Sequence, residues 1–542
     1  FSDKTGTITE GILKVVDVLL GDGFVYTTGD TVGKSFKSAT DSLKSELKAG
    51  LGLNNDSSIS NGVAIDSNTT DRALLNFLFS YGLVPESKES IVSKEAFTSA
   101  TKFASVTLDS GETYIKGAPE IILKGVTKYM TEDGEVAEFT RAVEESFTKA
   151  SVEQANRSMR LLAVVKEEKG VKTLIGAVCI RDNVRKGIKQ TVETLNGAGV
   201  SVVMVTGDRK ETAVAIAKEA GIYASESDVV LTHDELVGLT DDEVKAVLPR
   251  LKVVSRALPM DKKRLVNLAQ EMGAVTGMTG DGVNDAPSLK TSDVGFSMGD
   301  GTQAAQESSD IVILNNSLTS IEKAVIYGRT MTESVKKFIV FQLTVNVTTI
   351  ALSLIAPLIG YKEPFTIIQI LWINLIMDTL AALAFGEEPT LARYMKRQPI
   401  GRKEHILTNY MKSAIGVSGA FIAVVSAGIL ANLGNVQSIF DLSGSEEVLT
   451  FMFTFFIYAV IFNSLNTRSH GFNVLEYIGK NKKFIYVMTS IAVVQSVIIE
   501  FGGHVFSTVP LDLKHFGMAL LLAFLIIPVD MTRKLLVGSY KE

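Results

Sequence analysis

The sequence predicts a soluble α/β domain that is interrupted by an inserted α+β module and followed by an all-helical membrane domain. Charged and apolar residues alternate up to about residue 330, whereas long apolar stretches separated by short charged segments follow. Two short apolar segments of the first part end in Thr-Gly-Asp, which is typical of loops that follow parallel strands. Residues 14–172 instead carry hairpin turns and strands rich in Thr, Val and Tyr, which indicate a mixed α+β module.

The composition narrows the class of protein. At 542 residues the chain is too long for one compact domain and long enough for three. The formal net charge is −6, so no basic surface indicates a nucleic-acid partner. The single cysteine, Cys179, excludes a disulfide framework and an all-cysteine metal site.

Six apolar stretches are long enough to cross a bilayer, whose core of roughly 30 Å needs about 20 helical residues. They cover residues 338–360, 365–386, 411–433, 448–466, 484–502 and 515–536. The fourth contains Asn463 and Asn466 and also fits a buried helix of a soluble protein. The segments between the stretches decide between these two interpretations.

Basic residues gather in every second connection. Those after the second, fourth and sixth stretches contain Arg393, Lys396, Arg397, Arg402 and Lys403, then Arg468, Lys480, Lys482 and Lys483, then Arg533, Lys534 and Lys541. The alternate connections are poor in basic residues, and one of them carries Asp441, Glu446 and Glu447. This alternation is the orientation signal of a membrane protein, and it predicts that the soluble part lies in the cytosol.

We expect the α/β domain to be split by the inserted module. Residues 1–13 would begin the α/β domain, 14–172 form the inserted module, 173–332 complete the α/β domain, and 333–542 form the membrane domain. In the α/β domain we expect three strands and one helix, over residues 174–180, 200–205, 274–278 and 183–198 respectively. In the inserted module, Ser110-Gly111 and Asp133-Gly134 indicate turns, and residues 50–70 indicate a loop.

The first residues contain a candidate nucleophile. Residues 2–9 read SDKTGTIT, which would place Asp3 at the end of a strand. An aspartate is a useful nucleophile when a phosphoryl group must be held covalently and released later. Lys4 would neutralise charge beside it, and Thr5 and Thr7 offer hydroxyls and backbone donors. From this motif alone, a solvated turn before a strand stays an alternative.

Two further loops carry groups that fit the same chemistry. Asp281 and Asp285, on the loop that reads TGDGVND (279–285), can hold Mg²⁺ beside Asp3, because magnesium binds one or two carboxylates and phosphate oxygens. Lys262 opens a predicted helix and can balance the charge of a transferred phosphoryl group. The candidate catalytic residues are therefore Asp3, Lys4, Thr5, Thr206, Gly207, Asp208, Lys262, Asp281, Asn284 and Asp285.

Four motifs in this order resemble the P-type ATPase family, a membrane branch of the haloacid-dehalogenase-like fold. They are SDKTGT (2–7), KGAPE (116–120), MVTGDR (204–209) and TGDGVNDAP (279–287), and the resemblance covers essentially the whole chain. It implies a haloacid-dehalogenase-like catalytic domain, an inserted nucleotide-binding domain and a six-helix transmembrane domain. It also implies that ATP phosphorylates Asp3, that Asp3, Asp281 and the carbonyl of Thr5 bind Mg²⁺, and that Thr206 and Lys262 hold the phosphoryl group.

The resemblance assigns the nucleotide to the inserted module. It implies that Phe97 stacks on adenine, although from the residues alone Phe97 is more typical of a core aromatic. Asp71 stands where the family usually has glutamate, which makes its adenine contact less secure. The nucleotide-binding residues and the hinge residues that it implies are Asp71, Phe97, Lys102, Lys116, Gly117, Arg160 and Arg256, with Asp182 and Arg185 at the hinge.

An ionisable residue lies deep in the second apolar stretch. Asp378 follows Asn374 by four residues, so we expect both on one helical face, where their oxygens suit a hard cation. Asn346 in the first stretch could join them, and the alternative is a polar pair that links helices. Glu500 and Asp530 lie nearer to the ends of their stretches and are expected to be interfacial or packing groups.

Two membrane segments decide which ion is expected. Residues 342–347 (QLTVNV) and 371–390 are similar to plasma-membrane-type calcium pumps rather than to sodium or proton pumps. The expected function is therefore ATP-driven calcium transport by an integral protein of the plasma membrane, with its catalytic domains in the cytosol. The alternatives are a pump for manganese or sodium, a membrane-anchored phosphatase of the same fold, and a non-catalytic remnant. We expect ATP, Mg²⁺, Ca²⁺ and membrane lipid as partners.

The family normally has an actuator domain and four membrane spans before SDKTGT. Neither precedes Phe1 here, so we expect this chain to act together with a missing N-terminal part. The strand that leads into Asp3 would then be absent as well.

Overall fold

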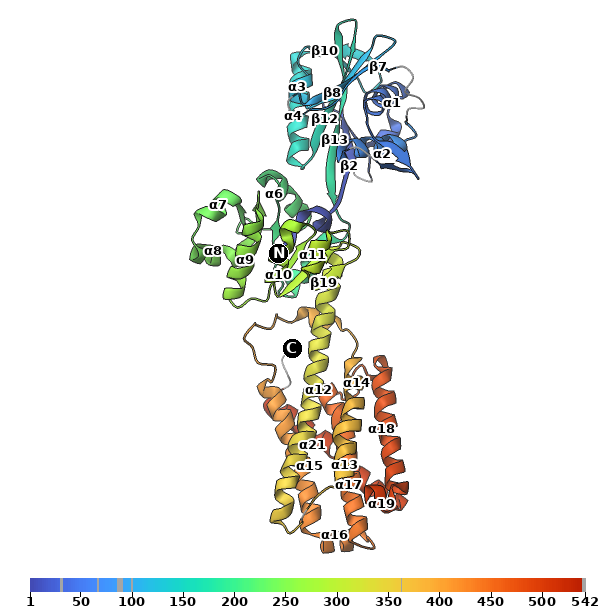
Figure 1. The fold of residues 1–542 in the computed structure, drawn as a ribbon, viewed down its shortest axis with the longest axis vertical. Coiled ribbons are helices and arrows are strands. Elements are labelled where there is room, and N and C mark those ends of the chain that lie inside the picture. The colour runs from blue at the N-terminus through green and yellow to red at the C-terminus, as the bar shows by residue number, and fades with distance from the viewer. Residues whose placement is uncertain (30–32, 66–67, 85–90, 99–100, 362, 539–542) are drawn as a thin grey trace. The chain divides into compact units, whose positions relative to one another are not determined.

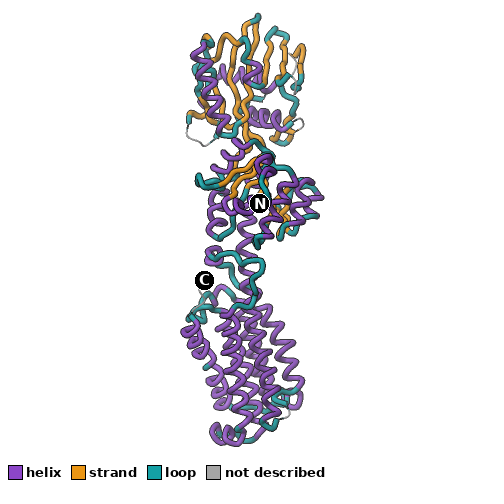
Figure 2. Tube along the Cα trace, turned by 90° about the vertical axis from the view of Figure 1, so that its left-hand side faces the viewer, coloured by secondary structure: helices purple, strands orange, loops and turns teal. Residues whose placement is uncertain are grey.

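The computed structural model describes residues 1–29, 33–65, 68–84, 91–98, 101–361 and 363–538. The chain forms two compact units, Phe1–Glu322 and Lys323–Glu542 (Figure 1). Each unit has hydrophobic cores of its own. The first unit contains the α/β domain and the inserted module, and the described residues of the second form helices and loops without strands, as the colouring in Figure 2 shows.

Parallel strands build the α/β domain. A four-stranded sheet has the order β1 (Ser2–Asp3), β14 (Met204–Val205), β16 (Leu251–Ser255), β15 (Val229–Thr232), and a three-stranded sheet has the order β17 (Gly277–Gly280), β18 (Val294–Met298), β19 (Ile311–Ile313). The amide of Thr279 donates to the carbonyl of Phe1 at 3.0 Å, so the two sheets meet where β1 lies beside β17. The loops after β1, β14, β16 and β17 therefore leave one edge of the combined sheet, where sites of parallel sheets form.

Helices connect these strands. They are α5 (Ile188–Gly197), α6 (Lys210–Glu219), α7 (His233–Gly238), α8 (Asp241–Val247), α9 (Pro259–Glu271), α10 (Ala286–Thr291) and α11 (Gln303–Glu307). Apolar side chains of the strands and of α9, among them Val205, Val254 and Leu265, form the core beneath the site. This core fixes the ends of β14 and β16 against α9.

The expectation that no strand leads into Asp3 is wrong. Ser2 and Asp3 pair in parallel with Met204 and Val205, and the amide of Ser2 donates to the carbonyl of Val203 at 2.8 Å. Two residues are enough because the ladder on one side and Thr279 on the other hold the short strand in place; the Asp3 amide donates to the Thr279 hydroxyl at 2.9 Å.

The inserted module is built on a ten-stranded sheet. Its main path has the order β4 (Lys34–Ser35), β3 (Val25–Thr27), β2 (Thr9–Leu19), β13 (Val171–Val184), β12 (Arg160–Glu168), β9 (Thr113–Gly117), β8 (Phe103–Leu108), β7 (Ile91–Glu95), and β10 (Val126–Met130) pairs with β13 and β11 (Val136–Glu138). Helices α1 (Asp41–Lys48) and α2 (Thr69–Ser80) cover one face of the sheet. On the other face lie α3 (Pro119–Ile122) and α4 (Arg141–Asn156) (Figure 1).

Residues 174–180 form a strand as predicted, but they do not belong to the parallel sheet. They lie in β13, which pairs antiparallel with β2 and β12 in the inserted module. Ile175 and Val178 pack in the core under α1 and α2, while Leu174 and Ala177 pack in the core under α4. Because both faces of the strand are covered, the run is apolar at every position. A buried strand of a parallel sheet has the same sequence pattern.

The predicted turns at Ser110-Gly111 and Asp133-Gly134 are confirmed between β8 and β9 and between β10 and β11. The loop expected over residues 50–70 is wrong in part, because it contains a hairpin of β5 (Ser58–Ser60) and β6 (Val63–Ile65). Asn61 and Gly62 both have positive φ, as a two-residue hairpin turn requires. The Asn-Gly pair was the signal that predicts this hairpin; residues 66–67 lie outside the described part.

Five helical segments of the described chain are long and apolar enough to cross a membrane. They are α12 (Leu318–Leu358), residues Ile367–Gly386, α15 (Asn409–Ala431), α17 (Ser445–Arg468) and α18 (Lys482–Phe501). The sixth expected stretch consists of two shorter helices, α20 (Leu513–Phe524) and α21 (Ile526–Val537). Pro528 explains this break, because it has no N–H for the carbonyl of Phe524 and its ring crowds that carbonyl.

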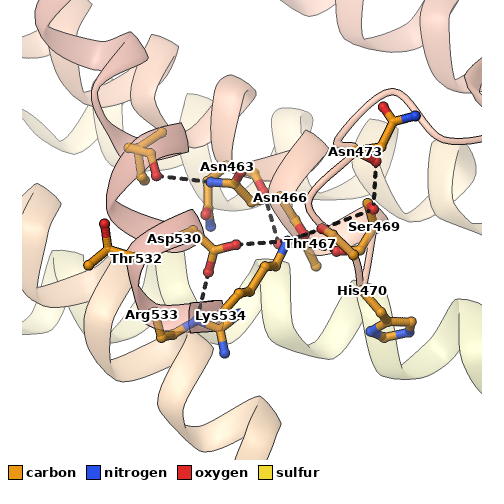
Figure 3. Close-up of polar contacts among 12 residues, drawn as sticks. Asn463, Asn466, Thr467, Ser469, His470, Asn473, Asp530, Thr532, Arg533 and Lys534 are labelled. Atoms are coloured by element: carbon orange, nitrogen blue, oxygen red, sulfur yellow. Dashed lines mark hydrogen bonds and ion pairs between the residues drawn. The ribbon is translucent and has the colours of Figure 1, made fainter. Parts of the chain in front are cut away.

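A buried ion-pair cluster within α21 is linked to the end of α17 by hydrogen bonds of Lys534 (Figure 3). Asp530 pairs with Arg533 at 2.7 Å and with Lys534 at 2.9 Å, and all three side chains are buried. Lys534 also donates to the carbonyls of Asn466 and Ser469 at the end of α17. Asp530 thus pairs with two cations of its own helix, one of which contacts the end of α17, and Glu500 is exposed at the end of α18.

Candidate active site

A buried lysine joins two carboxylates at the carboxyl edge of the parallel strands. Lys262 Nζ lies 2.7 Å from Asp3 Oδ2, at the end of β1, and 2.7 Å from Asp285 Oδ1, after β17. Lys262 stands in the first turns of α9, where Pro259 occupies the first helical position. Proline is favoured there because the first N–H groups of a helix have no partner within it. The predicted helix opening is therefore confirmed.

Three carboxylates meet beside this lysine. One oxygen each of Asp3, Asp281 and Asp285 lies within 4.8 Å of the others. Asp285 Oδ2 accepts from the amides of Asp281 and Gly282, both at 3.2 Å, which orients the loop after β17. A Cβ on Gly280 would lie 2.4 Å from the Asp285 Cβ, so this approach needs a glycine. The arrangement offers oxygen ligands of the kind and number that Mg²⁺ binds.

The charges of the site support one another. Burial alone would lower the pKa of Lys262, but the carboxylates of Asp3 and Asp285 outweigh it and raise this pKa above the ordinary lysine value. Burial, together with the negative charges of Asp3 and Asp285, raises the pKa of Asp281. Lys262 therefore stays protonated here. A further positive charge nearby would stabilise the ionised form of Asp281.

The predicted residues around the nucleophile differ in their surroundings. Lys4 is buried and its Nζ lies 2.8 Å from Asp208 Oδ2, while the Thr206 hydroxyl accepts from the Asp208 amide at 3.2 Å. Thr5 and Asn284 are exposed at the rim. Gly207 has open space around its Cβ position. The structure thus brings Asp3, Lys262, Asp281 and Asp285 together, pairs Lys4 with Asp208, and leaves Thr5 and Asn284 accessible.

The two strands that connect the α/β domain with the inserted module are fixed near the nucleophile. Asp182 of β13 accepts from the Thr9 hydroxyl at 2.5 Å and from the Gly11 amide at 2.9 Å. Arg185 donates to the carbonyls of Gly6 and Thr9. Both residues were predicted at the hinge.

Arg256, after β16, has a positive φ of 51° and donates its amide to the Asp208 carbonyl at 2.9 Å, while its side chain is exposed.

Within the inserted module, Asp71 lies on α2, Phe97 follows β7, Lys102 precedes β8, and Lys116 and Gly117 lie on β9. Lys116 is buried and pairs with Asp71 at 2.6 Å. Burial outweighs the Asp71 charge and lowers the pKa of Lys116. A Cβ on the neighbouring Gly117 would lie 2.7 Å from the Lys102 carbonyl oxygen. The absence of a side chain at Gly117 therefore lets these two segments lie this close. Phe97 is not a core aromatic, since 57% of it is exposed.

Arg160 is exposed at the start of β12. Asn68 is a residue that was missed: it caps α2 by accepting from the Asp71 amide at 2.9 Å and donates to the Asp71 carboxylate at 3.2 Å. The sequence Asn-Thr-Thr-Asp, a cap residue followed three positions later by an acid, was the available signal.

The membrane unit contains a buried carboxylate without a hydrogen-bond partner among the described residues. Asp378 is 4% exposed, and neither of its oxygens has such a partner. Asn346 is half-buried on α12, and Asn374 is exposed. The two residues expected on one helical face therefore differ in burial, with Asp378 buried and Asn374 exposed. Asn374 lies in a π-helical segment (Trp372–Met377) that precedes α14 (Asp378–Gly386), and such a segment changes the α-helical spacing of side chains.

Comparison with known proteins agrees with this architecture. Residues 1–293 match the haloacid dehalogenase-like hydrolase family, and residues 362–536 match the family described as cation transporting ATPase, C-terminus. The chain is 34% identical over 96% of its length to the putative calcium-transporting ATPase 11, plasma membrane-type, of Arabidopsis thaliana, covering 53% of that protein. It is also 34% identical over 99% of its length to calcium-transporting ATPase 10, plasma membrane-type, of Oryza sativa subsp. japonica, covering 55% of that relative.

The chain thus spans about half the length of the curated relatives that it matches. The first family match extends over more than half of the chain and includes the lysine, the three carboxylates and the inserted module. The second family match covers most of the membrane unit, and the two matches together identify the family of the chain. It belongs to the haloacid dehalogenase-like hydrolase family, in the P-type ATPase branch that includes the plasma-membrane-type calcium-transporting ATPases.

Proposed function

We propose that the chain is the catalytic and C-terminal membrane part of a P-type ATPase that couples ATP hydrolysis to calcium transport. The observation that carries this proposal is the contact of Lys262 Nζ with Asp3 and Asp285, beside Asp281. A carboxylate nucleophile that shares a lysine with further carboxylates suits phosphoryl transfer, which depends on positioning and on charge stabilisation.

In the proposed reaction an oxygen of Asp3 forms a bond to the γ-phosphorus of ATP, and the bond to the bridging oxygen breaks, so ADP leaves. Lys262 neutralises charge on the transferred group without giving up its proton, because its pKa is raised. We assign Thr206 the role of donating its hydroxyl proton to a phosphoryl oxygen, while its oxygen accepts from the Asp208 amide. Water later attacks the phosphorus of the aspartyl phosphate, which releases inorganic phosphate and regenerates the Asp3 carboxylate.

Magnesium fits the donor set of this site. Asp3, Asp281 and the Thr5 carbonyl would hold the ion, and Asp285 lies within reach of the same group of oxygens. When bound, Mg²⁺ supplies positive charge to the phosphate oxygens. Asp285 is already held by Lys262 and two amides, which leaves Asp281 as the more available ligand.

We assign nucleotide binding to the inserted module. Phe97 offers an exposed ring for the base, and Lys102 and Arg160 are exposed cations suited to phosphates. Lys116 and Asp71 form a buried pair at 2.6 Å that can present hydrogen-bonding groups to the base. A phosphatase has no need of such a module, so the pump is favoured over that alternative.

We assign the transported calcium to the neighbourhood of Asp378. Its two buried oxygens without a hydrogen-bond partner among the described residues suit a cation, since an unpaired buried carboxylate is otherwise costly. Asn346 and Asn374 can add neutral oxygens when further segments of the full-length pump cover them. We also propose that α20 and α21 together make a sixth crossing, kinked before Pro528, and that the pump lies in the plasma membrane.

The test is ATP-driven ⁴⁵Ca²⁺ uptake into inside-out vesicles that contain the full-length protein. We expect uptake with ATP and Mg²⁺, none in Asp3→Asn, and none in Asp378→Asn. Retained ATP binding in Asp3→Asn would show that the loss is chemical. Uptake of Mn²⁺ or Na⁺ in place of Ca²⁺ would contradict the assignment of the ion, and full uptake in Asp3→Asn would contradict the mechanism.

A further inference from the structure

We propose that His233 is a positioning residue for Lys262, acting through the carboxylate of Asp261. This inference rests on the proposed phosphoryl transfer to Asp3. His233 Nδ1 lies 2.7 Å from Asp261 Oδ2, and the same oxygen accepts from the Leu258 amide at 2.7 Å. Asp261 is 4% exposed and directly precedes Lys262 on α9.

The start of α9 depends on Asp261. Leu258 stands before the first turn and has no side-chain oxygen that could accept from the free N–H groups of the helix. The Asp261 carboxylate, three residues later, instead reaches back to the Leu258 amide. A buried carboxylate needs further partners, and the His233 N–H supplies one.

The fold places His233 for this contact. His233 directly follows β15, which pairs in parallel with β16, so Thr232 lies opposite Ser255. The connection from β16 to α9 thus runs beside the first turn of α7. Arg264, two residues after Lys262, donates to the carbonyl of Leu236 in α7 and to that of Leu239 just after it, which fixes α7 to α9 at a second point.

Lys262 needs this precision. Its Nζ lies 2.7 Å from each of two carboxylates, Asp3 at the end of β1 and Asp285 in the segment after β17, so a small shift or rotation of the first turn of α9 changes both contacts. A displacement of about 1 Å in a catalytic arrangement lowers rates by about a hundredfold. His233 does not itself contact Asp3, Asp281 or Asp285 in any described hydrogen bond or ion pair, and it acts through Asp261.

The test compares substitutions that keep or remove the Nδ1 position. Asparagine places its amide nitrogen near the position of Nδ1, whereas glutamine places it near Nε2. In the full-length protein we expect His233→Ala and His233→Gln to slow phosphorylation from saturating [γ-³²P]ATP by about ten- to a hundredfold. His233→Asn should stay close to the unmodified rate, and so should the exposed neighbour control Asp234→Asn.

Rapid-quench measurements across ATP concentrations separate positioning from loss of structure. The ATP concentration for half-maximal rate should stay unchanged, since the proposed nucleotide contacts lie in the inserted module. In an Asp261→Asn background, His233→Ala should add no further loss. Wild-type speed in His233→Ala, or equal slowing in His233→Asn, would overturn the positioning role alone. Absence of any Asp3-dependent adduct in the unmodified protein would overturn the proposed function and this role with it.

Discussion

Lys262 shows at the scale of single residues how the site combines stability with chemistry. Burying an ammonium is costly, and the two carboxylates at 2.7 Å offset that cost. The motif residues Asp3, Asp281 and Asp285 could be predicted from the sequence because each follows a strand that ends at the same edge. The partners Asn68 and His233 were not predicted, since their roles depend on contacts that only the fold creates.

The Asp71–Lys116 pair gives a prediction that depends on pH. The pKa of buried Lys116 is lowered, so its neutral, reactive amine exists at lower pH than that of N-acetyl-lysine in the same buffer. Asp71 opposes this shift, and Asp71→Asn should therefore move the labelling profile to still lower pH. Amine-reactive labelling followed by mass spectrometry measures both profiles. ATP should protect Lys116 in the unmodified protein; a profile that moves to higher pH in Asp71→Asn would contradict the account.

At the scale of elements, β2 and β13 decide how the first unit is built. They form one antiparallel ribbon from Val184↔Thr9 to Ala177↔Leu19, so the chain enters and leaves the inserted module side by side. The hydrophobic pattern predicted that residues 174–180 form a strand, but it could not predict which strands pair with it. A strand covered on both faces is apolar in parallel and antiparallel sheets alike. The break before Pro528 was open to prediction, because the proline is visible in the sequence.

Glu388 offers a test of how the membrane helices are held together. Its carboxylate pairs with Lys337 of α12 and with Arg468 of α17, both at 2.8 Å, and all three side chains are buried. Glu388→Gln leaves two buried cations without their anion, which should cost about 3–5 kcal/mol of stability. Thermal unfolding of the purified protein in detergent should show a clear loss of stability.

The neighbouring residue Glu387 is the matched control. It is exposed and pairs with Lys483 at the surface, where an ion pair contributes about 0–1 kcal/mol. Glu387→Gln should therefore unfold close to the unmodified protein. Equal effects of the two substitutions would mean that the buried network does not hold the helices as described.

At the scale of the whole molecule, the number of buried acids that are not paired with basic residues limits how many calcium ions the proposed pump can carry. Among the buried acids of the described membrane unit, Glu333, Glu388 and Asp530 are paired with basic residues. Asp378 lies in the second apolar stretch, while position 349 holds a threonine and residues 456–461 contain no acid. Thr349 donates its hydroxyl to the carbonyl of Val345. A second Ca²⁺ would add two positive charges without a carboxylate to meet them, at a cost of several kcal/mol. We therefore expect one Ca²⁺ per phosphorylated site.

Calcium bound per phosphorylated site in the full-length protein measures this number. Asp378→Asn should abolish calcium activation, because it removes the buried charge, whereas Glu500→Gln should preserve it, since Glu500 is exposed at the end of α18. A ratio of two ions per site, or unchanged activation in Asp378→Asn, would contradict the one-ion account.

The most direct test of the central claim is the identity of the residue that carries the phosphoryl group. The full-length protein, incubated with [γ-³²P]ATP, Mg²⁺ and Ca²⁺ and quenched in acid, should carry a label that hydroxylamine removes. Peptide mapping should place that label on Asp3, and Asp3→Asn should show none while it still binds ATP. Label on another residue, or label that persists in Asp3→Asn, would contradict the account.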